Sequence, residues 1–352
     1  MITVKISTID GVWPWTKQTP NERGVWDDCQ FYVNQGIEEC DYWVVLDGLH
    51  DTQKANCSPE NTILITGEPY SKLHYPPKFL KQFGTVVTFH RDIKHPNIIY
   101  SHPSEQWAVG RNVNDPKDGL KTIKTYDELK LLKDFRKDRT ISVITSNKAF
   151  YPGHLKRLEF VRKLAKQDRF HVDVFGLGIR EINDKWDALA KYKYHIALEN
   201  TRYPDYFTNK LTDPFLCGCY PFYYGCTNIQ DYFPQGSLSP IDIGDFEKTV
   251  ETIDKAIKSN RYEESVDKIR TARELVLDKY NAFPTIANII KRRPLKNNKQ
   301  EVTLVPAREL QLFSVRAIAK VKREIFLLRT KRKAEQCIFE LSRGIVRERA
   351  VK

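Results

Sequence analysis

Short apolar runs alternate with polar segments that contain glycine or proline along most of the chain. Nine runs have the length of buried strands: residues 2–6, 41–49, 62–66, 85–89, 97–100, 141–145, 171–175, 194–198 and 220–224. Residues 154–167 instead carry apolar side chains at a spacing close to 3.6, which predicts an amphipathic helix. Residues 246–258 are amphipathic too, a further helix is expected over 262–283, and polar segments such as 51–61 are expected to connect the strands. Strands that alternate with helices in this way predict an α/β fold with parallel sheets.

Residues 194–225 combine these elements into one unit with many polar side chains. A strand over 194–198 is followed by a polar loop, a helix over 207–216 and a strand over 220–224, which is a βαβ arrangement. In such sheets ligands bind beyond the carboxyl ends of the strands. The polar residues expected there are Glu199, Asn200, Arg202, Tyr206, Thr208, Asn209 and Lys210. A helix N-terminus with a lysine beside it suits a phosphate or a diphosphate.

The order of residues in this unit carries a resemblance to a known family. The string E-N-T-x(4)-Y-x-T-N-K-L-x-D-x(3)-C-G-C-Y-P-x-Y-Y-G resembles the signature of glycosyltransferase family 10, the α-1,3/4-fucosyltransferases, in its bacterial type. One position departs from the family pattern, because Asn209 stands where the family usually has glutamate. The resemblance covers about residues 62–260 and is tight over 194–225.

The resemblance implies both a fold and a reaction. The implied fold is two Rossmann-like domains that face each other across a cleft, the GT-B arrangement. The implied reaction is inverting transfer of L-fucose from GDP-fucose to a glycan hydroxyl, of the α-1,3 type, in lipopolysaccharide or surface-glycan synthesis. Two alternatives stay open: the same fold with a different nucleotide sugar, which Asn209 suggests, and a non-catalytic nucleotide-sugar-binding protein at the membrane.

Glu68 is the candidate general base. The run at 62–66 leads into Gly67, Glu68 and Pro69, so the carboxylate is expected at the carboxyl end of a strand. Proline biases the preceding residue to an extended backbone. The resemblance implies that a glutamate in this context takes the proton of the acceptor hydroxyl, a role that a carboxylate beside an apolar wall can perform. The alternative is a turn carboxylate that binds neighbouring backbone.

The resemblance also implies a set of donor-binding residues. Arg157, on the helix over 154–167, and Lys210 are expected to hold the diphosphate, with Lys156 and Arg162 as rivals for the arginine. A guanidinium suits a diphosphate because its planar donors form paired hydrogen bonds. Tyr206 and Asn209 are assigned to the nucleoside side, Asn200 is counted among the donor-binding residues, and Glu199 either contacts the sugar or fixes the loop. A solvated helix cation is the alternative for Arg157.

Neither a metal nor a cofactor is required by this interpretation. No D-x-D motif occurs at the end of a predicted strand. Asp47, His50 and Asp51 do not fall on one face of a regular element, which favours a solvated loop over a metal site.

Charge is concentrated near the C-terminus. The chain of 352 residues carries a net charge of +12, and residues 308–352 hold thirteen Lys and Arg against five Glu, a net of +8. Apolar residues recur there at helical spacing, which predicts a basic amphipathic helix on an anionic membrane surface. A helix packed on the body with a basic outer face is the alternative. Nucleic-acid binding is not expected, because the segment has few aromatic residues for stacking.

These features predict three segments and a location. Residues 1–137 are expected to form the acceptor-side α/β domain, 138–290 the nucleotide-sugar-binding α/β domain, and 291–352 a basic linker and an amphipathic helical tail. The seven cysteines are scattered without a C-x-x-C pair, and no apolar run approaches the roughly 20 residues of a membrane span. A cytoplasmic protein, peripheral on the inner face of the cytoplasmic membrane, is expected.

Overall fold

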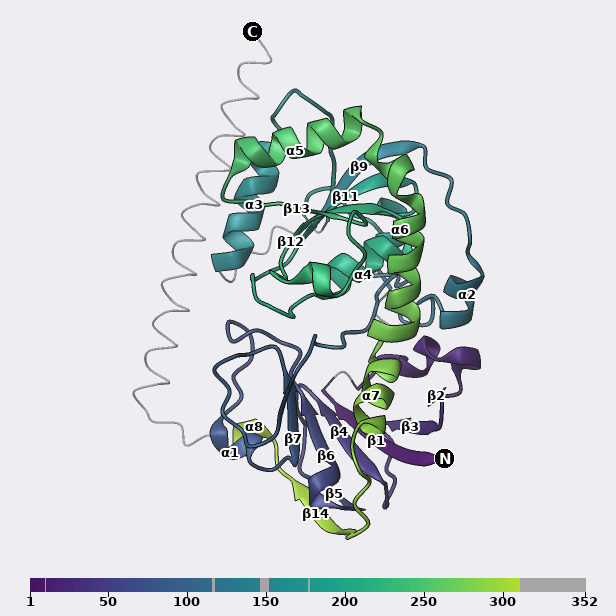
Figure 1. Ribbon diagram of the computed structural model, residues 1–352, viewed down its shortest axis with the longest axis vertical. Coiled ribbons are helices and arrows are strands. Elements are labelled where there is room, and N and C mark those ends of the chain that lie inside the picture. The colour runs from purple at the N-terminus through teal and green to yellow at the C-terminus, as the bar shows by residue number, and fades with distance from the viewer. Residues whose placement is uncertain (10, 116–117, 146–151, 177, 311–352) are drawn as a thin grey trace.

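Two mainly parallel β-sheets, one above the other in Figure 1, form the framework of the molecule. The computed structural model describes residues 1–9, 11–115, 118–145, 152–176 and 178–310. The predicted α/β fold with parallel sheets is therefore confirmed. The predicted amphipathic tail lies, apart from its first residues, outside the described residues.

The first sheet comes from the N-terminal third of the chain. Its strands run in the order β2-β3-β1-β4-β6-β7-β8. They are β1 (Ile2–Thr8), β2 (Val25–Trp26), β3 (Cys29–Val33), β4 (Tyr42–Leu46), β6 (Thr62–Ile65), β7 (Thr85–Thr88) and β8 (Ile98–Tyr100). All neighbours pair in parallel except β2 and β3. Every residue of β4, β6 and β7 is buried, as expected for parallel strands covered on both faces.

The second sheet is parallel throughout and has the order β10-β9-β11-β12-β13. Its strands are β9 (Arg139–Ile144), β10 (Asp173–Phe175), β11 (Tyr192–Leu198), β12 (Tyr220–Tyr224) and β13 (Ser239–Pro240). The helices of this part are α3 (Pro152–Leu164), α4 (Asn209–Leu216), α5 (Phe246–Lys258) and α6 (Arg261–Leu275). The predicted unit of β11, α4 and β12 is confirmed, and its strand ends place the polar loop at one edge of the sheet.

The chain then returns to the first sheet. After α6, a π-helical turn (Val276–Tyr280) leads to α7 (Ala282–Lys291), whose Phe283 and Ile286 pack against β1, β3 and β4 in the first sheet's core. The sequence predicts one continuous helix over 262–283, and this prediction is wrong. Asn281 has an extended ψ of 150°, and its side chain accepts the backbone N–H of Phe283, so it ends one helix and starts the next.

A two-stranded sheet follows where the sequence predicts only connecting segments. β14 (Gln300–Leu304) pairs with β5 (Gln53–Cys57) in antiparallel register. Residues 51–61 were expected to form a polar connection. In β5, however, Ala55 and Cys57 are buried while Lys54 and Asn56 are exposed, which is the alternation of a half-buried strand.

Residues 101–115 and 118–131 lie between the two sheets in sequence and contribute to the second core. Trp107, Val109, Ile123 and Leu129 pack with residues of β9, β11 and β12. This segment ends in α2 (Tyr126–Leu131), whose first turn is closed by a capping box of Thr125 and Glu128. These residues precede position 138, where the sequence places a domain boundary, and that boundary stays a prediction.

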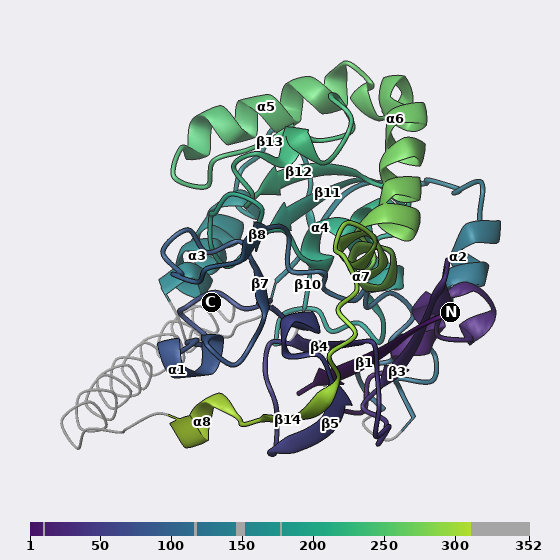
Figure 2. The ribbon, with the colours of Figure 1, turned by 60° about the horizontal axis from the view of Figure 1, so that its bottom comes forward.

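The remaining elements among the described residues are short. They are α1 (Pro77–Leu80), α8 (Ala307–Leu310) and five 3₁₀ turns: Trp15–Gln18, Pro20–Glu22, Pro59–Asn61, Lys185–Ala188 and Ile229–Asp231. Figure 2 shows β14 and α8 beside β5 and α1 at the base of the first sheet. None of the described helices has the length and apolar character that crossing a bilayer requires.

Candidate active site

Glu68 lies just beyond the carboxyl end of β6, at the edge predicted from the sequence. Its side chain lines a pocket of about 570 Å³ that also receives residues from the second sheet's part of the chain, including Lys185 and Asn209. Glu68 forms an ion pair with Lys72. Burial raises the pKa of Glu68 above its ordinary value, and the Lys72 ammonium opposes this shift.

The turn that carries Glu68 is held by Asp47, which follows β4. The Asp47 carboxylate accepts hydrogen bonds from the backbone N–H groups of Gly67 and Glu68 and from the Tyr75 hydroxyl. Burial raises the pKa of Asp47, and these hydrogen bonds lower it. The sequence favours a solvated loop for Asp47, and this interpretation is wrong. These contacts join positions 20 to 28 residues apart, so no pattern within a short stretch of sequence predicts them.

Arg157 and Lys210 line a second pocket, of about 290 Å³, at the carboxyl ends of β9 and β11. The Arg157 side chain is mostly buried, and its Nη1 donates to the carbonyl oxygen of Leu198 over 3.0 Å. Its Nε is buried without a hydrogen-bond partner among the described residues. Burial lowers the pKa of Arg157, and Glu199 opposes this effect. Arg157 is therefore a buried cation whose Nε–H group can still donate a hydrogen bond to a ligand. It is not a solvated cation on the helix surface.

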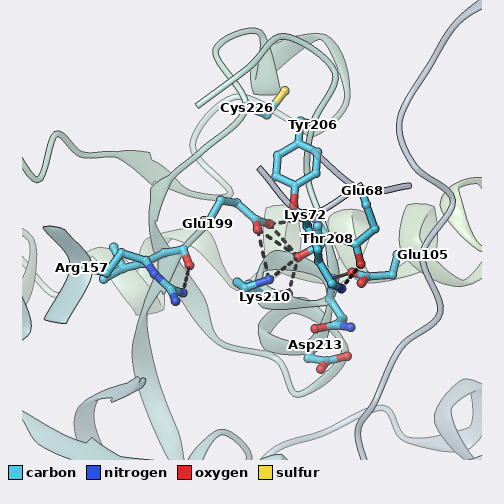
Figure 3. Close-up of polar contacts among 12 residues, drawn as sticks. Glu68, Lys72, Glu105, Arg157, Glu199, Tyr206, Thr208, Lys210, Asp213 and Cys226 are labelled. Atoms are coloured by element: carbon cyan, nitrogen blue, oxygen red, sulfur yellow. Dashed lines mark hydrogen bonds and ion pairs between the residues drawn. The ribbon is translucent and has the colours of Figure 1, made fainter. Parts of the chain in front are cut away.

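Glu199 fixes the loop that precedes α4. Its carboxylate is fully buried and accepts from the Thr208 backbone N–H over 2.8 Å and from the Thr208 hydroxyl over 2.9 Å. Lys210 Nζ lies 3.4 Å from the other oxygen of Glu199. Figure 3 shows these three side chains converging at the start of the helix. The N-terminus of α4 is thus already occupied by a carboxylate of the protein, that of Glu199.

Tyr206 and Asn200 flank this group in different ways. Tyr206 is buried, packs against Phe89 with ring centroids 4.8 Å apart, and directs its hydroxyl toward Thr208 in Figure 3. Asn200 lines the second pocket, and its Oδ1 is buried without a hydrogen-bond partner in the described part of the chain. An acceptor atom is therefore left for a ligand at Asn200, whereas Tyr206 lines neither pocket.

Asn209 and Lys185 line both pockets and connect them. Lys185 Nζ donates to Asn209 Oδ1 over 2.8 Å and to Asp213 Oδ2 over 2.7 Å. Asp213 is fully buried, and burial raises its pKa while Lys185 lowers it. The carboxamide that was expected on the nucleoside side is thus already bonded to a lysine of the protein.

Glu105 ties the connecting segment to the same helix. Its Oε2 accepts the backbone N–H of Asn209 over 2.9 Å, and Glu105 lines the Glu68 pocket as well. Neither Glu105 nor Lys185 was singled out from the sequence, because each lies outside the motif and meets it only in the folded chain. Asp213 is part of the motif, and its position there is the sequence feature that could have identified it as a site residue.

The described residues contain no group of three or more His, Cys, Asp or Glu side chains that could hold a metal ion. The carboxylates of the site are instead satisfied by backbone N–H groups, hydroxyls and lysines. What the arrangement offers chemically is a carboxylate of raised pKa in one pocket and cations in the adjoining pocket.

The part of the chain that contains the second sheet is similar to a known family. Residues 135–264 match the model described as glycosyltransferase family 10 (fucosyltransferase) C-term. The chain is 30% identical to alpha-(1,3)-fucosyltransferase B of Drosophila melanogaster over 206 residues, which are 54% of this chain and 41% of that protein. It is 35% identical to a putative fucosyltransferase-like protein of Arabidopsis thaliana over 109 residues, 30% of this chain and 20% of that protein.

Solved structures of alpha1,3-fucosyltransferase resemble the chain more loosely. The structure with GDP-fucose has a TM-score of 0.45 and 16% sequence identity, over 84% of this chain and 93% of that one. The chain spans less than half the length of the two curated relatives above. The family resemblance read from residues 194–225 is confirmed by the family model. Over residues 135–264 the chain is therefore similar to the C-terminal domain of glycosyltransferase family 10, the fucosyltransferases.

Proposed function

We propose that the protein is an inverting fucosyltransferase that moves L-fucose from GDP-fucose to a glycan hydroxyl. One observation carries the proposal: the pocket of Glu68 and the pocket of Arg157 and Lys210 share Lys185 and Asn209. A base for the acceptor and cations for the donor therefore adjoin each other. The GT-B arrangement, with the donor in the second domain and the acceptor facing it from the first, fits this division.

The reaction assigns one step to each pocket. The acceptor hydroxyl oxygen attacks the anomeric carbon of fucose as its proton passes to the Glu68 carboxylate. The bond between that carbon and the diphosphate oxygen breaks, and its electron pair leaves with GDP. Lys210 and Arg157 stabilise the negative charge that grows on the diphosphate. Attack from the side opposite the leaving group inverts the anomeric configuration.

The experiment is transfer from GDP-fucose to a panel of glycans, with the product's anomeric configuration read by NMR. We expect product of inverted configuration, and a loss of turnover of about 10²–10⁴-fold in Glu68→Gln, the usual contribution of a general base. The matched control is Glu301→Gln, which changes an exposed glutamate on β14. Retained configuration, or equal loss in both variants, would contradict the assignment of Glu68.

A second candidate is the same reaction with another nucleotide sugar. The observation in its favour is Asn209, whose carboxamide replaces the family's usual glutamate and already binds Lys185. A neutral hydrogen bond is weaker than a charged one by about 1 kcal/mol, which weakens any contact to ribose hydroxyls. Competition among GDP-fucose, GDP-mannose and UDP-sugars separates the two candidates, because only the true donor yields product at low concentration.

The α-1,3 linkage, the role in lipopolysaccharide or surface-glycan synthesis, and a peripheral place on the inner face of the membrane are parts of the same proposal. The basic composition of residues 308–352 supports the membrane contact. Sedimentation of the full chain with anionic and neutral vesicles tests it: binding to anionic vesicles that is lost at high salt is expected, and no binding to either would contradict it.

A further inference from the structure

Three donors converge on a single carboxylate oxygen next to Glu68. Asp47 Oδ1 accepts from the Gly67 N–H over 2.5 Å, from the Glu68 N–H over 3.1 Å and from the Tyr75 hydroxyl over 2.6 Å. Two of these donors belong to the turn that presents Glu68. A change in the position of Asp47 would therefore move the backbone of the proposed base.

Both sides of this contact have unusual backbone requirements. Asp47 has φ of +62°, in the left-handed region that residues other than glycine seldom adopt. Opposite it, a Cβ on Gly67 would lie 2.7 Å from Asp47 Oδ2, closer than real Cβ atoms approach other atoms. Glycine at 67 and the left-handed conformation at 47 together allow the carboxylate to reach the turn.

His90 holds the same turn from its other end. The Nε2 atom of His90 lies 3.1 Å from the carbonyl oxygen of Glu68 and donates to it, since the carbonyl can only accept. The imidazole is buried and stacks on Tyr70 with ring centroids 4.0 Å apart. The N–H and the C=O of Glu68 are thus both fixed, and its side chain is left to extend into the pocket.

Building on the proposed function, we propose that Asp47 is a positioning residue for Glu68. Its carboxylate fixes the turn so that Glu68 points at the acceptor, and its negative charge makes Glu68 a stronger base. Asp47 itself acts through Glu68 and takes no proton from the substrate. This assignment goes beyond the family resemblance, which marks only Glu68 on this side of the site.

The charged groups around Glu68 determine whether its pKa rises or falls when the charge of Asp47 is removed. Lys72 pairs with Glu68 and favours its ionised form, while Asp47 and Glu105 disfavour it through like charge. Tyr75 and His90 bind the backbone of Glu68 rather than its carboxylate. Removing the charge of Asp47 therefore lowers the pKa of Glu68, because the ionised carboxylate loses a repulsive neighbour.

The decisive experiment is an NMR titration of the Glu68 carboxyl carbon, assigned by its absence in Glu68→Gln. In Asp47→Asn the pKa of Glu68 should fall, because a close like charge is removed. Asp51→Asn, which removes an exposed acid from the same loop, is the control and should leave that pKa unchanged. An unchanged or raised pKa of Glu68 in Asp47→Asn would overturn the proposal.

A pair of kinetic variants tests the positioning role. Asparagine at 47 keeps an acceptor oxygen for the three donors, whereas alanine does not. We expect kcat to fall about 10²-fold in Asp47→Ala and less than about tenfold in Asp47→Asn, with the Kd of GDP-fucose unchanged in both. Equal losses in the two variants, or weakened donor binding, would contradict positioning. If the pKa of Glu68 falls in Asp47→Asn but the wild-type protein forms no product, the Asp47 contact stands and the proposed function is wrong.

Discussion

The pocket around Glu68 and the pocket around Arg157 are built in different ways. The first gathers carboxylates from three separate segments, at Asp47, Glu68 and Glu105. Asp47 is held by a contact between two strand ends, and Glu105 by a contact with the start of α4. The second gathers cations from α3 and α4, two helices of the second sheet's part of the chain. Substitutions in the first pocket should therefore alter proton transfer, whereas those in the second should alter donor binding and the departure of the leaving group.

After Glu68→Gln, Lys210→Met should have the largest effect of the changes that probe this division. The substitution removes a cation from the second pocket while keeping an unbranched side chain only one atom shorter. We expect kcat to fall about 10²–10³-fold, the usual cost of losing one group that stabilises developing negative charge. Steady-state kinetics measure it, with Lys248→Met on the exposed face of α5 as the control. An unchanged kcat would remove Lys210 from the leaving-group role.

The link between the pockets can be tested through the Lys185–Asp213 ion pair. Asp213 is fully buried and Lys185 is 27% exposed, so removing one partner leaves the other charge poorly solvated. We expect Lys185→Met and Asp213→Asn each to lower the free energy of unfolding by about 2–3 kcal/mol, and the double variant by less than their sum. Urea unfolding measures these values.

The control for this double-mutant cycle is Asp267→Asn, which breaks an exposed ion pair with Arg270 on α6. Its expected cost is below about 1 kcal/mol, because exposed pairs contribute little. If the single variants at 185 and 213 were as mild as this control, or if their effects were additive, the ion pair would not stabilise the junction between the pockets.

The smallest expected effect is a shift in the pH dependence of kcat/KM. Glu68 must be ionised to accept a proton, and burial raises its pKa above the ordinary value near 4.5. kcat/KM should therefore fall as pH decreases, with a midpoint above 4.5, and should lose this acid limb in Glu68→Gln. Rates measured between about pH 4 and pH 8 give the midpoint. A midpoint at or below 4.5 would mean that the pocket does not disfavour the charged form.

The same division explains which features the sequence could predict. Lys210 and the neighbouring part of the second pocket come from the continuous motif at 194–225, and Arg157, from α3 outside the motif, lines the same pocket as expected. β12 and α5 match their predicted bounds. Periodicity within a short window carries this information. The roles assigned to Glu199, Asn200, Tyr206 and Asn209 toward the donor stay predictions.

The first pocket depends on contacts between distant positions. Asp47 meets Gly67 and Tyr75, and Glu105 meets Asn209 more than a hundred residues away. The pairing of β5 with β14 is of the same kind, because it joins residues that lie on average about 250 positions apart. Such contacts follow from how the strands are ordered in the sheet, which local patterns of polar and apolar residues do not specify.

Calorimetric titration with GDP-fucose tests most directly whether the two pockets divide the reaction. The wild-type protein and Glu68→Gln should bind GDP-fucose with the same Kd, because Glu68 serves the acceptor. Lys210→Met should bind it about tenfold or more weakly, because a charged contact to the diphosphate is lost. If Glu68→Gln weakened binding as much as Lys210→Met, or if the wild-type protein bound no GDP-fucose, the assignment of donor and acceptor to separate pockets would be contradicted.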